Sequence, residues 1–427
     1  ILPHPIYQID VANHLLDYAF TATHPEGALA VPRLARAAGV LHLKPRLFYL
    51  PDQAALGEYR GFLGDEVVQL EQRPNAPDEG AMPPHLGGGD GELDYEDYDG
   101  LAGKLLDKPY KHRVDQEAML RARLLDMFIG DWDRHRSQWR FTEREENGGK
   151  LYTPIAMDRD QAFANYDGAA LWVARLMVPQ ARSLQPFDGR YGPLRWLNFN
   201  ARDVDALMLN RVSHARWMEI AKQVQASLTD EVVDEAFATW HPEAYAHDGE
   251  RIAEALKARR EGLLAAAEEF YRRLSRNVDV TGSSRDDRFG LHFLPGGAVR
   301  VVVARKKKPK SELEPTAWFD RTFVPSETAE LRLYALDGDD LLEVHGTPHN
   351  AIDVRFVGGE GKDVVAAANG TVAAPAVRLY DREKGARIDP SIAVTDERSE
   401  KSWLNQYEQR ENHEPDFGAI LPGLAAN

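Results

Sequence analysis

The interpretation of this chain depends on ten residues, Gly130-Asp131-Trp132-Asp133-Arg134-His135-Arg136-Ser137-Gln138-Trp139. They follow an apolar pattern of helical period and lead into a strand-like run, Gln138 to Thr142. A second strand-like run extends from Leu151 to Met157, and the residues between the two runs, Glu145-Glu146-Asn147-Gly148-Gly149, are typical of a tight turn. The sequence therefore predicts a β-hairpin directly after the ten-residue segment.

This hairpin should gather several carboxylates and an amide. Strands of about six residues return the chain to its starting point, so Asp158 should lie near Gln138 and near the loop that carries Asp133. Like charges placed so close are costly unless a cation or positive side chains neutralise them. Oxygen ligands of this kind favour a divalent metal, magnesium or manganese first.

A structural alternative stays open at this point. Arg159 can pair with Asp131 or with Asp160 and neutralise the cluster without metal. The same residues would then form a salt-bridge cluster that only stabilises the fold.

The spacing matches that of protein kinases, which place a catalytic Asp five residues before an Asn metal ligand and a second metal-binding Asp after a hairpin. Here Gln138 stands five residues after Asp133, and Asp158 follows the hairpin. The carboxylate of Asp133 would accept the proton of an attacking hydroxyl, while Gln138 and Asp158 would hold the metal that bridges the nucleotide phosphates. Gln supplies the same amide oxygen as Asn, through one more methylene.

Asp133-Arg134-His135 through Gln138-Trp139, with Asp158 after the hairpin, resembles the atypical kinases: the HipA-like toxin kinases, the type II phosphatidylinositol 4-kinases and the secretory-pathway kinases. The resemblance implies magnesium (or manganese) and ATP as cofactors, Asp133 as the catalytic residue and Gln138 and Asp158 as metal ligands. It also implies five supporting residues, namely Asp131, Arg134, His135, Arg159 and Asp160.

Two departures from the kinase pattern bear on activity. First, Arg159-Asp160 follows Asp158 at the place where protein kinases have Phe-Gly. Second, no strand before Asp133 can be assigned the Lys with a Glu partner that kinases carry there. Lys44 is a poor candidate for this Lys because it stands next to Pro45. We therefore expect this stretch of chain to be inactive alone. The competing hypothesis is a non-catalytic, pseudokinase-like interaction or spacer module.

A broader resemblance runs from about residue 10 to 427. The chain is similar to the middle region of large bacterial outer-membrane proteins, which carry a metallophosphoesterase domain before it and a surface-antigen type β-barrel after it. This implies a bacterial cell-envelope location at the outer membrane, with the flanking domains or an outer-membrane complex as partners. The start at Ile1 and the linker-like end, Pro422-Gly423-Leu424 to Asn427, indicate a piece of a longer protein. The matching stretches are His24-Pro25 with Ala28 to Pro32, Leu56-Gly57-Glu58-Tyr59, Glu71 to Pro74, Val114-Asp115-Gln116, Arg121-Ala122-Arg123-Leu124, Gly130 to Gln138, Asp158 to Phe163 and Lys257-Ala258-Arg259-Arg260.

Composition excludes several classes of protein. Among 427 residues, 52 Lys and Arg stand against 68 Asp and Glu, and the net charge of −16 disfavours binding to nucleic acid. The chain has no Cys, which removes disulfide scaffolds, thiolate zinc sites and cysteine nucleophiles. No run approaches the roughly 18 to 20 apolar residues that span a bilayer, so we expect no membrane insertion by this segment.

The predicted fold class is α+β, with a mostly helical, kinase-like lobe over 1–277 that includes a mobile acidic loop over 74–100. A small all-β domain, either a sandwich or a solenoid-like structure, is expected over 278–395. An extended linker that leads towards a β-barrel is expected over 396–427. Helices are expected over 10–22, 28–38, 115–131 and 248–277. Strands are expected over 47–50, 66–70, 278–280, 289–293, 299–303, 331–334, 341–344, 352–356 and 377–380.

Two turns of the β-rich domain resemble calcium-binding turns. Gly358-Gly359-Glu360-Gly361-Lys362-Asp363 matches the Gly-Gly-x-Gly-x-Asp repeat of calcium-binding β-rolls, and Leu336-Asp337-Gly338-Asp339-Asp340 is similar. However, the two turns are 23 residues apart, whereas a β-roll shares each ion between tandem repeats of about nine residues. Tight turns without an ion are the alternative. The candidate calcium ligands are Asp339, Asp340, Gly359, Gly361 and Asp363.

Overall fold

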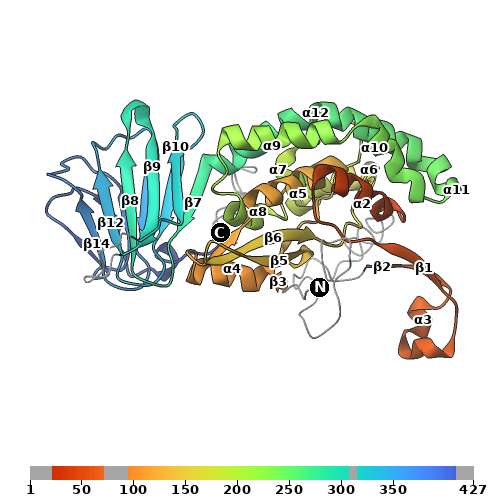
Figure 1. Ribbon diagram of the computed structural model, residues 1–427, viewed down its shortest axis with the longest axis horizontal. Helices are drawn as coiled ribbons and strands as arrows, with labels where there is room; N and C mark the ends of the chain where they lie inside the picture. Colours follow the sequence, from red (N-terminus) through yellow and green to blue (C-terminus); the bar gives the residue numbers. More distant parts are fainter. Residues whose placement is uncertain (1–21, 72–94, 307–314, 410–427) are drawn as a thin grey trace.

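The computed structural model of the chain describes residues 22–71, 95–306 and 315–409, and its fold is α+β, as predicted (Figure 1). A mostly helical body comes first, and a β-rich domain follows it. Each part has its own buried apolar cluster, one formed by residues between Ala30 and Tyr271 and the other by residues between Val278 and Ile392. The predicted helix over 10–22 falls almost wholly outside the described residues. No helix in the described ranges is long and apolar enough to cross a bilayer.

The helices of the body pack around α5, whose residues Met119, Leu120, Leu124, Met127 and Phe128 are all fully buried. The predicted helices over 28–38, 115–131 and 248–277 correspond to α2, α5 and α12. The helices are α2 (Gly27–Ala38), α4 (Tyr98–Asp107), α5 (Gln116–Ile129), α6 (Ala169–Met177), α7 (Leu194–Leu197), α8 (Arg202–Met208), α9 (His214–Ser227), α10 (Asp230–Ala236), α11 (Pro242–Ala244) and α12 (Glu250–Arg276).

The two ends of α5 fix where the ten-residue segment begins. The Asp115 carboxylate accepts a hydrogen bond from the amide of Ala118 (3.0 Å) and caps the first turn. At the other end Gly130 adopts a left-handed conformation with φ of 75°, which closes the helix. The chain therefore turns away from α5 directly before Asp131.

A four-stranded sheet contains the predicted hairpin. Its order is β3 (Tyr95–Asp97), β5 (Trp139–Glu146), β6 (Gly149–Ala156) and β4 (His112–Val114). Strands β5 and β6 are antiparallel, with Trp139 opposite Ala156, which confirms the hairpin. Both central residues of its turn, Asn147 and Gly148, have positive φ (53° and 73°), as a two-residue hairpin turn requires.

The prediction of a loop as far as residue 100 is wrong at its end. Tyr95–Asp97 forms β3, and α4 begins at Tyr98 because the Asp97 carboxylate caps it by accepting the amide of Gly100 (2.8 Å). Burial of Tyr98 and Leu101 then stabilises a segment whose acidic composition suggested a loop. Residues 72–94 of that prediction lie outside the described residues.

A two-stranded ribbon precedes this sheet in the chain. Strands β1 (Arg46–Leu50) and β2 (Glu66–Leu70) form where strands were predicted; they pair antiparallel, and the short helix α3 (Arg60–Leu63) lies between them. Figure 1 shows the ribbon extending away from the body, and none of its strand residues is buried. Lys44 lies just ahead of β1.

The β-rich domain is a solenoid of stacked coils. Strands β7 (Asn277–Thr281), β11 (Glu330–Tyr334), β13 (Asp353–Val357), β15 (Arg378–Tyr380) and β17 (Thr395–Asp396) form one parallel sheet. The second sheet contains a parallel part, formed by β8 (Asp287–Phe293), β12 (Leu341–His345), β14 (Asp363–Ala367) and β16 (Ala386–Ile388). Two antiparallel strands extend this sheet beside β8, namely β9 (Val299–Arg305) and β10 (Phe319–Phe323). Strands β10, β14, β16 and β17 were not predicted.

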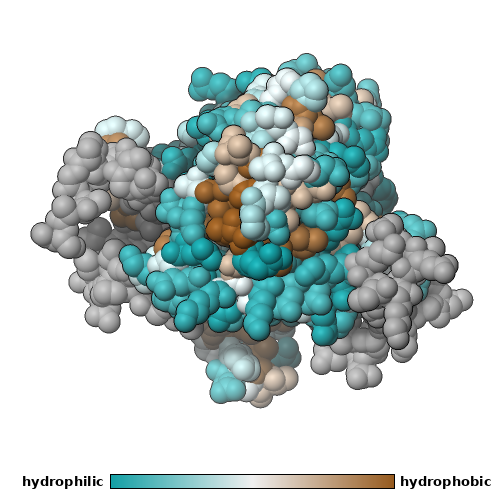
Figure 2. Space-filling model, turned by 90° about the vertical axis from the view of Figure 1, so that its left-hand side faces the viewer, coloured by the Kyte–Doolittle hydropathy of each residue, from teal (hydrophilic) through white to brown (hydrophobic). Residues whose placement is uncertain are grey.

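The two ends of the solenoid differ. At the first coil, β7 follows α12 without a gap, so the solenoid is fused to the helical body. Figure 2 looks onto the opposite end and shows apolar residues at the centre of a hydrophilic face. After the last coil the chain returns to the body, where Tyr407 packs against Tyr334 with ring centroids 4.9 Å apart and Gln409 donates to the carbonyl of Asp203 (3.0 Å). The described part of the predicted linker is thus largely exposed but contacts the solenoid through Tyr407 and the body through Gln409.

Candidate active site

The hairpin places Gln138 next to Asp158, as the sequence predicts. Gln138 directly precedes β5 and Asp158 comes two residues after β6, and the amide of Met157 donates to the carbonyl of Gln138 (3.0 Å). The side-chain amide of Gln138 donates to Oδ2 of Asp158 (3.3 Å). An amide and a carboxylate of the proposed metal site therefore lie side by side.

Asp133 occupies the loop between α5 and the hairpin and is reachable from solvent, with 28% of its side chain exposed. The amide of Asn200 donates to its Oδ1 (2.9 Å), and Nε2 of His135 lies 3.7 Å from its Oδ2. The backbone amide of Asp133 donates to the carboxylate of Asp131 (3.3 Å), which holds the loop. Asp133 thus combines a fixed position with access to a substrate.

Asp158 has an unusual backbone conformation, with φ of 52° in the left-handed region. The contacts around it hold this conformation: its amide donates to Oε2 of Glu71 (3.0 Å), and Arg134 donates to its carbonyl (3.2 Å). Residues held in sparsely populated conformations concentrate at functional sites.

Asp158 and Asp160 differ in their partners from the other carboxylates of the site, since Asp131 pairs with Arg134 and Asp133 lies near His135. Asp160 accepts a hydrogen bond from the side chain of Gln161 (3.0 Å). Partial desolvation, with added repulsion from Asp158 and Asp133, raises the pKa of Asp160. Burial also raises the pKa of Glu71. In the described ranges, no Arg or Lys side chain forms an ion pair with Asp158 or Asp160.

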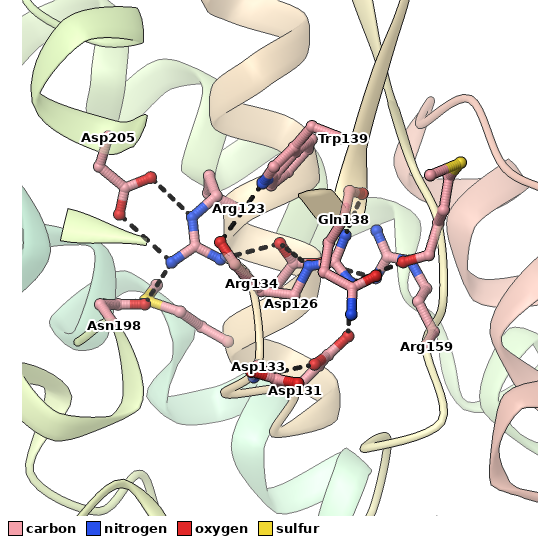
Figure 3. A network of polar contacts seen from close by, with 12 residues as sticks. Arg123, Asp126, Asp131, Asp133, Arg134, Gln138, Trp139, Arg159, Asn198 and Asp205 are labelled. Carbon is pink, nitrogen blue, oxygen red and sulfur yellow. Dashed lines mark hydrogen bonds and ion pairs between the residues drawn. The ribbon is translucent and has the colours of Figure 1, made fainter. Parts of the chain in front are cut away.

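Beneath the site lies a buried network of charges, drawn in Figure 3. The carboxylate of Asp126 on α5 lies 2.8 Å from Arg123, 3.5 Å from Arg134 and 2.7 Å from Arg159. Arg123 also pairs with Asp205 of α8 (2.7 Å), so the network ties α5, the loop and α8 together. Its members are almost completely removed from solvent.

The expected partner of Arg159 is wrong. Arg159 pairs with Asp126, whereas Asp131 pairs with Arg134 at 3.2 Å. Arg134 joins the loop to the hairpin, where it also donates to the carbonyl of Met157 (2.7 Å). Burial raises the pKa of Asp131 to about 7 in spite of Arg134. The arginines therefore stabilise the loop and leave Asp158 and Asp160 unpaired.

Sequence reasoning missed two contacts of the site, those of Glu71 and Asn200. Glu71 follows β2 and enters the sequence analysis only in the matching stretch Glu71 to Pro74, and Asn200 offers in the sequence no more than a possible helix cap. Neither has a local signal for its role, because both act across long distances in sequence on Asp158 and Asp133.

The donors present fit a magnesium ion shared with a nucleotide. Magnesium commonly takes one or two protein carboxylates and completes its shell with waters and substrate phosphates. Asp158 offers one carboxylate and Gln138 one side-chain amide, whose NH2 group faces Asp158 and whose oxygen could face a metal after the amide turns over, and magnesium binding stays a prediction. No set of three or more His, Asp or Glu side chains is grouped to hold an ion by itself in the part of the chain that the structure describes.

The candidate calcium turns stack on each other in successive coils of the solenoid. Oδ1 of Asp340 accepts the amide of Asp287 (2.6 Å), and Oδ1 of Asp363 accepts the amide of Asp340 (2.8 Å). Asp339 accepts the amide of Lys362 (2.9 Å). Gly359 and Gly361 have φ of 87° and 126° and press against the turn above, where a Cβ would meet backbone oxygens. These turns therefore have structural roles, and calcium binding stays a prediction.

No protein-family model matches the chain, and no curated protein matches it. Two solved structures are similar to part of it. A Helicobacter pylori proinflammatory kinase, CtkA, is 11% identical with a TM-score of 0.32, over 58% of this chain and 88% of that one. HipA of Shewanella oneidensis MR-1, solved with HipB and operator DNA, is 12% identical with a TM-score of 0.23, over 57% and 55% of the two chains. At these TM-scores the likeness stays partial, and the site is interpreted from its own geometry.

Proposed function

We propose that this chain carries an atypical-kinase-like site that binds magnesium or manganese together with ATP, and that the intact parent protein transfers phosphate. The observation that supports this most strongly is the placement of Gln138 beside Asp158, with Asp133 five residues earlier in an exposed loop. Among the described residues Asp158 and Asp160 have no Arg or Lys as ion-pair partner, and their carboxylates create a local excess of negative charge that a divalent cation would relieve.

Each residue has a distinct part in the proposed reaction. Asp133 accepts the proton of the attacking hydroxyl, whose oxygen bonds to the γ-phosphorus as the bond to the β-phosphate oxygen breaks and ADP leaves. Gln138 and Asp158 would hold the metal, which when bound would neutralise charge on the phosphates. Asn200 and the amide contact of Asp133 with Asp131 orient the base. Arg134 keeps the loop and the end of β6 together.

A second candidate is a pseudokinase-like module that kept the fold and lost the chemistry. The buried network around Asp126 favours it, because these ion pairs stabilise the loop without any metal. The small ribbon of β1 and β2 favours it too, since its strands bear no Lys, which a kinase needs for the phosphates. On this alternative the domain binds neighbouring domains and holds them apart.

The cellular setting is a separate proposal that rests on the sequence resemblance alone. We propose that the parent belongs to the bacterial outer membrane, with a metallophosphoesterase domain upstream and a β-barrel downstream. Membrane fractionation of the parent should recover it with the outer membrane. Recovery in the cytosolic fraction would contradict the outer-membrane location. It would not test the proposed metal and nucleotide site.

The proposed activity is tested by phosphate transfer from ATP in the parent protein. With magnesium present, the parent should label itself or a generic protein substrate, and Asp133→Asn should reduce the rate by at least ~100-fold because the proton acceptor is lost. The conservative change leaves the hydrogen bond from Asn200 possible. Equal rates in the parent and in Asp133→Asn, or no transfer by the parent, would favour the pseudokinase alternative.

A further inference from the structure

A small cavity of about 30 Å³ lies at the junction of the helical body and the solenoid. The body contributes the ends of α4 and α8 and the start of α5, with Leu105, Leu207 and Gln116. The solenoid contributes Thr281 at the end of β7 and Phe319 at the start of β10. Elements α8 and β7 lie side by side near the centre of Figure 1. None of the residues proposed for metal or nucleotide binding lines this cavity.

Arg211, in the loop between α8 and α9, brings a positive charge to the cavity wall. It is mostly buried, and its Nε is closed to solvent. Its backbone amide donates to Oε1 of Gln116 (2.8 Å). In the part of the chain that the structure describes, its guanidinium has neither a hydrogen-bond acceptor nor a carboxylate within ion-pair distance. The guanidinium lies 5.8 Å from the ring centre of Phe319, a cation–π contact that offers the N–H groups no acceptor atom.

Arg211 differs in this respect from the other buried arginines. Several arginines of the described ranges have an Nε that is closed to solvent and lacks a hydrogen bond, but each of them has an ion pair or donates through a terminal nitrogen. Partial desolvation, with added repulsion from Arg113, lowers the pKa of Arg211 to about 10. The guanidinium therefore keeps its charge at neutral pH. A cation largely removed from water without a counter-charge is costly.

The polar groups of the wall do not supply an acceptor to Arg211. The side-chain oxygen of Asn210 accepts from Gln116 (3.2 Å), and the carbonyl of Asn210 accepts from Arg321 (2.6 Å). Among the described residues the hydroxyl of Thr281 forms no hydrogen bond, and a Thr hydroxyl can donate. The cavity thus presents two donors without acceptors, one from the body and one from the solenoid.

The carboxylates that stand next to the cavity wall in the chain have other partners. Asp107 pairs with Lys108 (2.7 Å), and Asp279 pairs with Arg332 (2.6 Å). The carboxylate of Asp115 caps the first turn of α5. The positive charge at the cavity is therefore not balanced by these neighbours.

We infer that this cavity binds a small monovalent anion of the class of chloride, held by the guanidinium of Arg211 and the hydroxyl of Thr281. A cavity needs about 10–15 Å³ to hold one water molecule. A volume of about 30 Å³ therefore admits a monoatomic ion and is too small for phosphate or an organic acid. The anion supplies the counter-charge and the acceptor that Arg211 lacks. Because its two ligands belong to different domains, the bound anion also stabilises the junction between the body and the solenoid.

The test compares sodium chloride with sodium gluconate at constant ionic strength, on the full chain without metal or nucleotide. Chloride should raise the melting temperature saturably above its value in gluconate, because an ion that binds the native state stabilises it by mass action. Crystals grown in bromide should show an anomalous scattering peak at hydrogen-bond distance from the guanidinium of Arg211. Equal melting temperatures in the two salts, or the absence of a bromide peak at Arg211, would overturn the inference.

Two variants locate the binding. Arg211→Met keeps an unbranched stem against Phe319 and should lose the chloride-dependent shift, and in gluconate it should be at least as stable as the wild type because an uncompensated cation is gone. Arg276→Met, at an exposed position of α12, is the matched control and should keep the full shift. Thr281→Val removes the second donor and should weaken chloride binding at least ~3-fold.

The outcomes separate anion binding from a packing role of the arginine. If Arg211 served packing alone, Arg211→Met would lower the melting temperature equally in chloride and in gluconate, and this result would refute the site. If Arg211→Met does not fold, Thr281→Val and the bromide crystals decide. Unchanged chloride affinity in Thr281→Val would place the anion elsewhere.

Discussion

Glu71 accepts a hydrogen bond from the backbone amide of Asp158 over 3.0 Å, and this contact joins the end of β2 to the residue that follows the hairpin. The two residues are 87 positions apart in sequence. Asp158 has a positive φ, so the contact also helps to hold a backbone conformation that the chain would not prefer by itself. The ribbon of β1 and β2 is thereby coupled to the proposed metal site.

Glu71 is predicted to be a positioning residue. Glu71→Ala removes the acceptor for the Asp158 amide and should weaken metal-dependent ATP binding by the parent by about 10-fold or more, as is usual for residues that orient a metal ligand. Glu71→Gln keeps an acceptor oxygen and should restore most of the affinity. Isothermal titration with ATP at fixed magnesium measures both. Equal losses in the two variants would contradict a positioning role.

Asp158→Asn separates the chemical site from a salt-bridge cluster. Asn tolerates the left-handed conformation, so the free energy of unfolding should change by less than about 0.5 kcal/mol. Metal-dependent ATP binding should be lost because the charged metal ligand is gone. In a cluster that serves stability alone, the variant would instead lower stability and change no binding. Urea denaturation and titration of the same preparation distinguish the two.

The buried network predicts a large effect of Asp126→Asn on stability. Three arginines would lose part of their counter-charge in a region closed to solvent, at a cost of about 3–5 kcal/mol. Glu269→Gln breaks an exposed ion pair with Arg273 on α12 and should cost less than about 1 kcal/mol. Chemical denaturation followed by circular dichroism gives both values. Similar costs would mean that the network contributes no more than a surface pair.

The stacked aspartates of the solenoid predict a stability that falls as pH rises. Burial raises the pKa of Asp287 to about 6, of Asp363 to about 8 and of Asp340 to about 9, although Arg305 lies 3.8 Å from Asp287 and Lys306 is near the other two. The ordinary pKa of an unfolded Asp is about 3.9. Between about pH 4 and 9 the folded state therefore keeps protons that the unfolded state releases, and stability declines across that range.

Asp340→Asn tests this expectation. The Asn side chain still accepts the amide of Asp287 but needs no proton, so the variant should be more stable than the wild type by about 1–3 kcal/mol at pH 8. The advantage should shrink at pH 5. Asp337→Asn, at an exposed position in the same turn, serves as the control and should show no such change. An advantage independent of pH would contradict the raised pKa values.

Local signals were sufficient to predict the parts of the fold that position the site. The helical period with Asp115 before it and Gly130 after it predicts α5, and the turn at Asn147-Gly148 predicts the hairpin. Because a hairpin brings its ends together, the contact between Gln138 and Asp158 followed from the same pattern.

Relationships that depend on burial or on distant partners could not be predicted from the sequence. Asp126 carries no local signal that distinguishes it from other polar residues of a helix, yet it is the partner of Arg159, whereas Asp131 pairs with Arg134. The coils of the solenoid were not recognised as a repeat, since the hairpin of β9 and β10 interrupts the first one. The 23-residue distance between the two candidate calcium turns is the length of one coil, which accounts for their stacking.

The most direct test of the central claim is a thermal melt with magnesium and ATP, added separately and together, to this chain and to the longer parent. Binding to the native state raises the transition by mass action, about 2.7 kcal/mol at one hundred times the dissociation constant. We predict a shift in the parent that requires both metal and nucleotide and that is absent in Asp158→Asn. No shift in the parent, or the same shift in the variant, would contradict a kinase-like site.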